Sequence, residues 1–287
     1  MKSDKEVIHY QIKVAKHGMV YPKFTMLTGE HLDIQFSTKV KAKNVKWSST
    51  NKKIATINKE GKIVAKKRGN VIIKGNDGKR TYVSKITVKK RPKNIVYLTF
   101  DDGPSYIGTN KLLENLDKYN ARVTFFVLGD RVNDYKDTLK RAHDMGNLIG
   151  SHTYSHSNLL KLDDYAVINE IKKTNDAIRN VVNSETLYLR PPYGNINSNI
   201  KTISNMYTIL WDLDTEDWKY KDANRIANYI VENAHDGAIV LLHDLYETSV
   251  DGALLAMEKL QNEGYAFVTV EEMATLKNVK LDKEKRY

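Results

Sequence analysis

The hydrophobic pattern of the chain changes near residue 92, and this change limits the fold more than any other feature of the sequence. From residue 8 to residue 90, apolar and polar residues alternate in short runs separated by glycine-containing turns. This alternation is typical of strands with one buried face, and short strands at this spacing predict a β-sandwich. From residue 95 onward, apolar strand-like runs alternate with helical patterns. That order predicts parallel βα units, and about seven of them predict a barrel.

The 287 residues are therefore expected to form two domains. Residues 89–94 are charged and contain Pro92, as a linker would. We predict an all-β domain over residues 1–92, linker included, and an α/β domain over residues 93–287. No apolar run reaches the roughly 18 residues of a membrane span. No apolar stretch follows the first six residues, so the protein is either cytoplasmic or has lost an export signal.

The net charge of +11 is unevenly distributed. Residues 1–90 hold 22 Lys and Arg against 6 Asp and Glu, a charge of +16, whereas residues 91–287 hold 24 against 29, a charge of −5. A basic domain joined to a mildly acidic one indicates attachment to a polyanion such as nucleic acid, anionic lipid or an anionic wall polymer. A solvated lysine-rich surface is the alternative. Nucleic acid is disfavoured because no basic helix with interleaved aromatics is present.

Five predicted strands end in polar segments. They are TFDDGP at 99–104, SHTYSH at 151–156, RPPYG at 190–194, WDLDTEDW at 211–218 and LLHD at 241–244. In barrels of this kind, chemistry takes place where strands end and loops begin. The five segments are therefore the candidate site. Cysteine is absent from the chain, which excludes thiolate nucleophiles and Cys-ligated zinc.

Two of these segments favour a metal site. Asp101 and Asp102 are adjacent in an extended chain, so their side chains point to opposite sides and can do different jobs. His152 and His156 can grip one cation from a tight loop, and imidazole suits zinc. A third ligand from Asp102 would complete a facial triad. The alternatives are a turn with a helix cap and two surface histidines.

The other three segments add a cation, carboxylates and a histidine. The two prolines after Arg190 fix the backbone, which would hold its guanidinium in place to pin a carboxylate. The acidic and aromatic cluster that ends at Trp218 follows a strand, and His243 ends a strongly apolar one. Read alone, each segment also fits a structural role: a rigid turn, a solvated loop with a buried Trp, and a structural histidine.

Together, and in this order, the five segments resemble the polysaccharide deacetylase family of carbohydrate esterases, the family 4 type, over about residues 94–276. The resemblance implies a distorted (β/α) barrel of about seven strands and a metal-dependent hydrolase that cleaves the linear amide C–N bond of N-acetylated sugars. It implies one divalent ion, zinc first, with cobalt or nickel as alternatives. Carried over by motif, Asp102, His152 and His156 resemble the metal ligands, Asp101 the catalytic base and Arg190 its partner.

The same resemblance assigns five further positions. Tyr193 is similar to the residue whose backbone N–H helps to hold the oxyanion. Asp217 resembles the carboxylate that tunes His243, and His243 resembles the general acid. Trp218 and Leu241 resemble the apolar wall that receives the acetyl methyl group.

Residues 8–90 resemble the bacterial immunoglobulin-like domains, group 2, of surface proteins. The resemblance rests on the VKWSSTN segment at 45–51 and the strand patterns IATI, GKIVA and GNVII that follow it. Trp47 is then expected to be a core residue. A surface domain with a charge of +16 indicates an extracellular or wall-associated protein that binds anionic wall polymer. We therefore expect the substrate to be N-acetylglucosamine of peptidoglycan. The alternatives are a chitooligosaccharide or biofilm poly-N-acetylglucosamine deacetylase, and a non-catalytic wall-binding protein.

Overall fold

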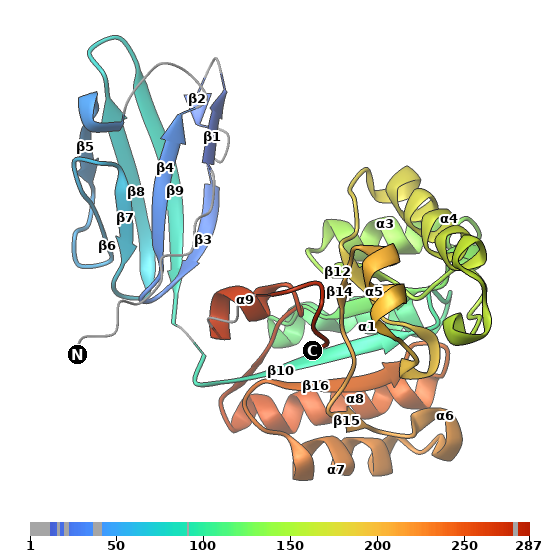
Figure 1. Ribbon diagram of the computed structural model, residues 1–287. Coiled ribbons are helices and arrows are strands. Elements are labelled where there is room, and N and C mark those ends of the chain that lie inside the picture. The colour runs from blue at the N-terminus through green and yellow to red at the C-terminus, as the bar shows by residue number, and fades with distance from the viewer. Residues whose placement is uncertain (1–11, 16–17, 20–22, 37–41, 91, 278–280) are drawn as a thin grey trace, which may run out of the picture. The chain divides into compact units, whose positions relative to one another are not determined.

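The computed structural model describes residues 12–15, 18–19, 23–36, 42–90, 92–277 and 281–287 (Figure 1). Its contacts divide the chain into two compact units, Met1–Arg91 and Pro92–Tyr287. We call these the N-terminal unit and the C-terminal unit and describe each by itself. In the described part of the chain, no helix combines the length and the apolar character needed to cross a membrane.

The described residues of the N-terminal unit form strands and one short 3-10 helix, η1. The elements are β1 Ile12–Ala15, β2 Gly18–Met19, β3 Lys23–Leu27, β4 His31–Phe36, η1 Ala42–Asn44, β5 Lys46–Ser49, β6 Ala55–Ile57, β7 Lys62–Ala65, β8 Gly69–Asn76 and β9 Thr81–Lys89. They form two sheets, with strand orders β2-β1-β4-β7-β6 and β3-β9-β8-β5. Two pairs, β1 with β4 and β3 with β9, are parallel, and the others are antiparallel.

One apolar core serves both sheets of the N-terminal unit. Ile63 from the first sheet and Ile73 and Ile86 from the second are at most 1% exposed and belong to the same cluster. Trp47 packs against this cluster but is only partly buried. Strand β9 alternates exposed and buried residues along its first six positions, as period-two reasoning requires. The structure therefore gives two sheets around a common core, and the sandwich geometry stays a prediction.

The C-terminal unit alternates strands and helices along the chain. Its elements are β10 Asn94–Asp101, α1 Gly108–Leu116, η2 Asp117–Tyr119, β11 Thr124–Val127, α2 Gly129–Val132, α3 Lys136–Asp144, β12 Leu148–Ser151, η3 Leu159–Lys161, α4 Asp164–Val182, β13 Tyr188–Leu189, η4 Pro192–Gly194, α5 Ser198–Ser204, β14 Tyr207–Thr208, β15 Leu213–Asp214, α6 Asp217–Tyr220, α7 Ala223–Asn233, β16 Ala238–His243, α8 Glu247–Asn262, β17 Tyr265–Phe267 and α9 Glu272–Lys277. The longest helix, α4, begins where the Asp163 side chain accepts the Ala166 N–H, as an N-cap does.

The strands of the C-terminal unit form one parallel sheet that curls toward a barrel. The strand order is β14-β13-β12-β11-β10-β16-β15, and β17 also pairs with β10. The two edge strands, β14 and β15, follow each other in sequence. Only residues 209–212 join them, and the five steps from residue 208 to residue 213 span at most about 18 Å in an extended chain. The two edges of the sheet therefore lie close together, although no ladder joins β14 to β15 in the described chain.

This arrangement corrects one sequence-based expectation. The apolar run at 207–213 predicts a single strand, but the structure divides it between opposite edges of the sheet. The Ile209 N–H still bonds to the β13 side, at Leu189 O, whereas the Asp212 N–H already bonds to the β16 side, at Ile239 O. The run is apolar because it is buried while it crosses from one edge to the other.

Strand β10 lies at the centre of this sheet, and residues 95–101 of it are all buried. Strands that are covered on both faces read as continuous apolar runs, and this one reads NIVYLTFD. Its exit places two carboxylates at the rim of the sheet. The helices pack their apolar sides on the same core, with Leu112, Ile226 and Met257 among the fully buried residues.

We predict that Leu98→Ala lowers the free energy of unfolding of the C-terminal unit by about 2–5 kcal/mol, because Leu98 is fully buried in the central strand. Urea denaturation followed by helical circular dichroism measures this unit, since the α-helices of the described chain all belong to it. Leu255→Ala, at a position that is 37% exposed on α8, is the matched control. It should cost under about 1 kcal/mol, and equal losses would contradict the assignment of the core.

Candidate active site

The carboxyl ends of five neighbouring strands, β13, β12, β11, β10 and β16, meet at one rim of the curled sheet. The ladder aligns Asp101, the last residue of β10, with His243, the last residue of β16. On the other side of β10, β11 pairs with β10 and β12 pairs with β11. Ser151, the last residue of β12, in turn pairs with Leu189, the last residue of β13. The next residues along the chain are His152 and Arg190. Residues spread over more than 140 positions therefore face one place because the strands are parallel and in register.

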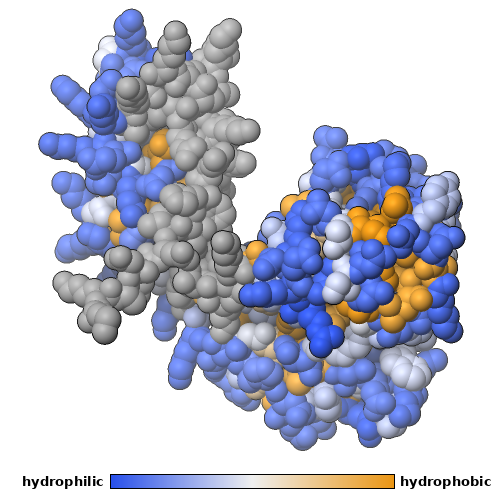
Figure 2. Space-filling model, in the orientation of Figure 1, coloured by the Kyte–Doolittle hydropathy of each residue, from blue (hydrophilic) through white to orange (hydrophobic). Residues whose placement is uncertain are grey.

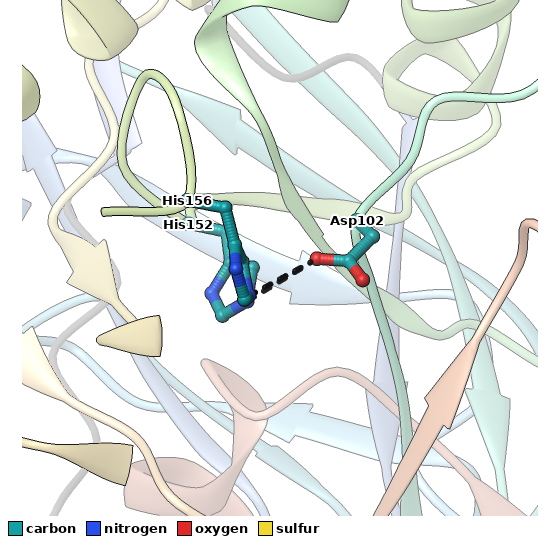
Figure 3. A group of neighbouring side chains, drawn as sticks. All are labelled: Asp102, His152 and His156. Carbon is teal, nitrogen blue, oxygen red and sulfur yellow. Dashed lines mark ion pairs between the residues drawn. The ribbon is translucent and has the colours of Figure 1, made fainter. Parts of the chain in front are cut away.

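Asp102, His152 and His156 form a group that can hold a metal ion. Asp102 Oδ1 lies 3.5 Å from His152 Nε2 and 3.6 Å from His156 Nε2, so both histidines turn toward the carboxylate (Figure 3). The ligand atoms of the three residues all lie within 4.8 Å of one another. Asp102 Oδ1 is buried and has no hydrogen-bond partner within the described chain. A buried oxygen without a partner between two imidazoles fits a cation, because one Asp and two His are a facial ligand set.

The backbone turns sharply at two of these three residues. Asp102 has φ of 69° and His156 has φ of 58°, both in the left-handed region that residues other than glycine rarely adopt. The turn at Asp102 ends strand β10 and sends the chain into the following loop. Strained backbone of this kind is common at functional sites.

His152 is held in its neutral form. Its Nδ1 lies 2.7 Å from the Arg190 carbonyl oxygen, so Nδ1–H donates and Nε2 is left to face Asp102. The residue is 3% exposed, and this burial lowers the pKa of His152 to about 3. A neutral imidazole is the form that coordinates a cation.

Arg190 is fully buried and holds Asp101. Its Nη1 donates to Asp101 Oδ1 at 2.9 Å and to Thr99 Oγ1 at 2.6 Å. Its Nε and Nη2 donate to the carbonyl oxygens of Ile209 at 3.2 Å and Leu210 at 2.6 Å. Burial raises the pKa of Asp101, and the charges of Arg190 and His243 act in the opposite direction.

His243 lies at the same rim, and Asp217 holds it through two hydrogen bonds. One oxygen of Asp217 lies 2.8 Å from His243 Nδ1, and the other accepts the His243 backbone N–H at 2.7 Å. This leaves His243 Nε2 free to face Asp102, whose Oδ2 lies 4.0 Å away. Burial acts to lower the pKa of His243, but the hydrogen bond and charge of Asp217 prevail and raise it to about 9.

The remaining predicted site residues lie on three different elements. The Tyr193 ring meets the His156 ring edge-on with 4.8 Å between centroids, and its backbone has φ of 61°. Trp218 is the second residue of α6 and is 51% exposed. Leu241, on β16 opposite Thr99, is 6% exposed. Tyr193 therefore contacts the group formed by Asp102, His152 and His156 directly.

Two acidic residues to which the sequence analysis assigns no role lie beside the site. Glu170, on α4, accepts the backbone N–H groups of Tyr154 and Ser155, both at 2.9 Å, and so holds the loop between the two histidines. Asp244 is fully buried directly after His243, and its carboxylate accepts the Thr109 hydroxyl. Burial raises the pKa of Asp244 to about 7.

The C-terminal residues of the chain support Arg190 from outside the sheet. The Tyr287 N–H donates to the Thr208 carbonyl at 3.0 Å, and the Leu210 N–H donates to the Tyr287 carbonyl. These bonds fix both sides of the short segment whose carbonyl groups receive the Arg190 donors. No sequence motif predicts this contact, because it joins segments that are far apart along the chain.

Comparison with protein families agrees with these observations. The model of the family described as polysaccharide deacetylase matches residues 88–209, and that of the bacterial Ig-like domain, group 2, matches residues 30–88. Both resemblances drawn from the motifs are thereby confirmed.

Individual relatives agree with the family models. The peptidoglycan-N-acetylmuramic acid deacetylase PdaC of Bacillus subtilis is 40% identical over 185 residues, which are 64% of this chain and 40% of the relative. The peptidoglycan-N-acetylglucosamine deacetylase PgdA of Listeria monocytogenes is 37% identical over 199 residues, 68% of this chain and 43% of the relative. This chain thus matches only about two fifths of the length of either relative.

Solved structures extend the likeness to the fold. The structure of PdaC has a TM-score of 0.63 and 39% identity, and the match covers 64% of this chain and 92% of that one. A family 4 acetyl xylan esterase of Clostridium thermocellum, solved with a cobalt ion, has a TM-score of 0.64 and 31% identity, over 67% of this chain and 97% of the other. The chain therefore belongs to the polysaccharide deacetylase family.

We predict that His156→Ala abolishes retention of a divalent ion, because one of three ligands is lost from a group whose ligand atoms lie within 4.8 Å. Metal analysis after gel filtration measures the effect. Tyr165→Ala, at a position that is 79% exposed on α4, is the control and should keep the metal. Full metal content in the His156 variant would show that the ion binds elsewhere.

Proposed function

We propose that this protein is a metal-dependent hydrolase that removes N-acetyl groups from N-acetylglucosamine in cell-wall peptidoglycan. One observation carries the proposal. A buried carboxylate with an arginine partner, Asp101, and a histidine with a carboxylate partner, His243, are aligned on neighbouring strands beside a three-ligand group. Amide hydrolysis needs a base for the attacking water, an acid for the leaving nitrogen and an electrophile for the carbonyl group.

Asp102, His152 and His156 would hold the ion, with zinc as our first assignment and cobalt or nickel as alternatives. When bound, such an ion polarises a carbonyl group and lowers the pKa of water to about 7 in favourable sites. The partnerless Asp102 Oδ1 and the neutral His152 support this role. The cobalt ion in the esterase structure supports the alternative metal.

The protein side chains would then move two protons. Asp101, held in place by Arg190, takes a proton from the water as the C–O bond forms. The backbone N–H of Tyr193 donates to the developing oxyanion. His243, which Asp217 keeps protonated, gives a proton to the nitrogen as the C–N bond breaks. Acetate and a free amino sugar leave, with Trp218 and Leu241 as the wall around the acetyl methyl group.

The proposed domain boundaries follow from the two family resemblances. We propose an Ig-like domain over residues 1–92 and a deacetylase domain over residues 93–287, acting outside the cell or on its wall. The named substrates of PdaC and PgdA support peptidoglycan as the polymer, and the PgdA name favours glucosamine. The charge of +16 on residues 1–90 supports binding to an anionic wall polymer.

The function is tested by acetate release from purified peptidoglycan, chitooligosaccharides and poly-N-acetylglucosamine, with and without chelator. Asp101→Asn should keep its metal and lose about 10²–10⁴-fold in kcat, the usual worth of a general base. Asp102→Asn is the matched control and should lose the metal itself. Near-normal kcat in a metal-loaded Asp101→Asn protein would refute the assigned base. Mass spectrometry of the product sugars separates glucosamine from muramic acid.

We predict a pH profile whose basic limb belongs to His243. The acid must carry its proton, so activity is present below the folded pKa of about 9 and is lost as pH rises through it. Asp217→Asn removes the charge that raises this pKa and should move the limb toward the ordinary value of about 6.5. The measurement is kcat against pH on an N-acetylglucosamine oligomer. An aryl acetate, whose leaving group needs no proton, is the control substrate. An unmoved limb in Asp217→Asn would contradict the role of His243.

A further inference from the structure

Two loops of the N-terminal unit bring five basic side chains together at one end of its sheets. The loops are residues 50–54, between β5 and β6, and residues 66–68, between β7 and β8. The backbone N–H groups of Lys66 and Lys67 both bond to the Ile54 carbonyl oxygen, at 2.7 and 3.2 Å. We call the side chains that this contact gathers the basic loop pair. They are Lys52, Lys53, Lys66, Lys67 and Arg68.

The loops are held in place by their own hydrogen bonds and packing. The Asn51 carbonyl oxygen accepts the Ile54 N–H at 3.0 Å, and its side chain accepts the Lys53 N–H at 3.0 Å. Gly69 lies so close to Ile54 that a Cβ atom there would come within 2.6 Å of the Ile54 side chain. The basic side chains are therefore brought together by a built structure and not by one flexible run of lysines.

The charges of the basic loop pair are not compensated. All five residues are exposed, and none forms an ion pair within the described chain. Glu30, whose carbonyl oxygen accepts the N–H of Ala65 beside the second loop, is 7% exposed, and its carboxylate accepts the Leu27 N–H at 2.7 Å. The described surface of this unit is mostly hydrophilic (Figure 2).

The acidic residues of the turns lie at the opposite end of the same strands. Glu60 is in the β6–β7 turn, and Asp77 is in the β8–β9 turn, where it accepts the Tyr82 hydroxyl at 2.7 Å. The ladder pairs Gly69 with Val88, so the chain leaves β9 at the basic end, toward Lys89 and Lys90. The same two turns also carry Lys59, Lys79 and Arg80, so acidic and basic residues are mixed there, whereas residues 50–54 and 66–68 contain no acidic residue.

We propose that the basic loop pair is the binding site of this protein for a linear polyanion of the cell wall. The proposal rests on the proposed function only for the choice of the wall as the source of the polymer. Five cations on two fixed loops complement a chain that repeats a negative group, because neighbouring anions can meet neighbouring cations. The repeating group is a phosphodiester or a carboxylate, and the experiment separates these two sources.

Two variants with equal charge test the site in the full chain. The loop variant carries Lys52→Gln, Lys53→Gln, Lys66→Gln, Lys67→Gln and Arg68→Gln. The matched control carries Lys43→Gln, Lys46→Gln, Lys59→Gln, Lys74→Gln and Lys85→Gln, five exposed lysines of the same unit outside the two loops. Each variant loses five positive charges, so general attraction by net charge predicts equal effects.

The measurements are retention on isolated cell walls and titration with poly(glycerol phosphate) and polyglutamate at several salt concentrations. We expect the loop variant to bind at least about tenfold more weakly to one of the polymers, with a shallower salt dependence, because fewer exposed charges are screened. The control should lose less than about threefold. Equal losses in the two variants, or no binding of the parent protein to either polymer, would overturn the proposal. Tighter, loop-dependent binding to duplex DNA would overturn it as well.

Acetate release by the same preparations keeps this test separate from the test of the proposed function. If the loop variant loses polymer binding while a small N-acetylglucosamine oligomer is still deacetylated at the parental rate, the loops act in binding alone. If no glycan releases acetate even with the parent protein, the proposed function fails, and the binding comparison still decides the role of the loops.

Discussion

The buried ion pair between Arg190 and Asp101 is the interaction on which the rest of the site depends. The two side chains are 0% and 3% exposed, so both charges have left water, and the cost of that transfer is offset only by complete hydrogen bonding. The Arg190 donors reach an aspartate, a threonine and two carbonyl groups, and its own carbonyl group fixes His152. One residue thus ties the central strand to the edge of the sheet. Removing it would leave a buried carboxylate without a partner, which typically costs several kcal/mol.

The positive φ at Asp102 explains how two neighbouring carboxylates come to differ. Asp101 ends the regular ladder and is buried against Arg190. One residue later, the backbone turns at φ of 69° and carries the Asp102 carboxylate to the two histidines. Had the strand continued as extended chain, Asp102 would have pointed to the opposite face. The turn places both acids on the same rim with different partners, and so with different chemistry.

The residues at the rim of the site could be predicted from sequence because they follow directly after strands. Parallel strands with in-register ladders bring their last residues together, so TFDD, SHTYSH and LLH could be placed without coordinates. The contacts that support the rim could not be placed. Glu170 under the histidine loop, the Tyr287 backbone beside Leu210 and the crossing at 209–212 join segments through space, and no local pattern marks them. The basic loop pair is of the same kind, since its five charges are visible in sequence but the contact between the two loops that carry them is not.

Two histidines on the same rim are held in opposite protonation states by their surroundings. His152 is buried against a carbonyl group, and desolvation without a hydrogen-bonded carboxylate lowers its pKa to about 3. His243 is also largely buried, but Asp217 bonds to it directly and raises its pKa to about 9. At neutral pH the first is a free base that can coordinate a cation, and the second is an acid with a proton to give. Exchanging their partners would exchange their protonation states, so the hydrogen-bond partner behind each ring, a carbonyl group for His152 and a carboxylate for His243, determines which chemistry that ring can perform.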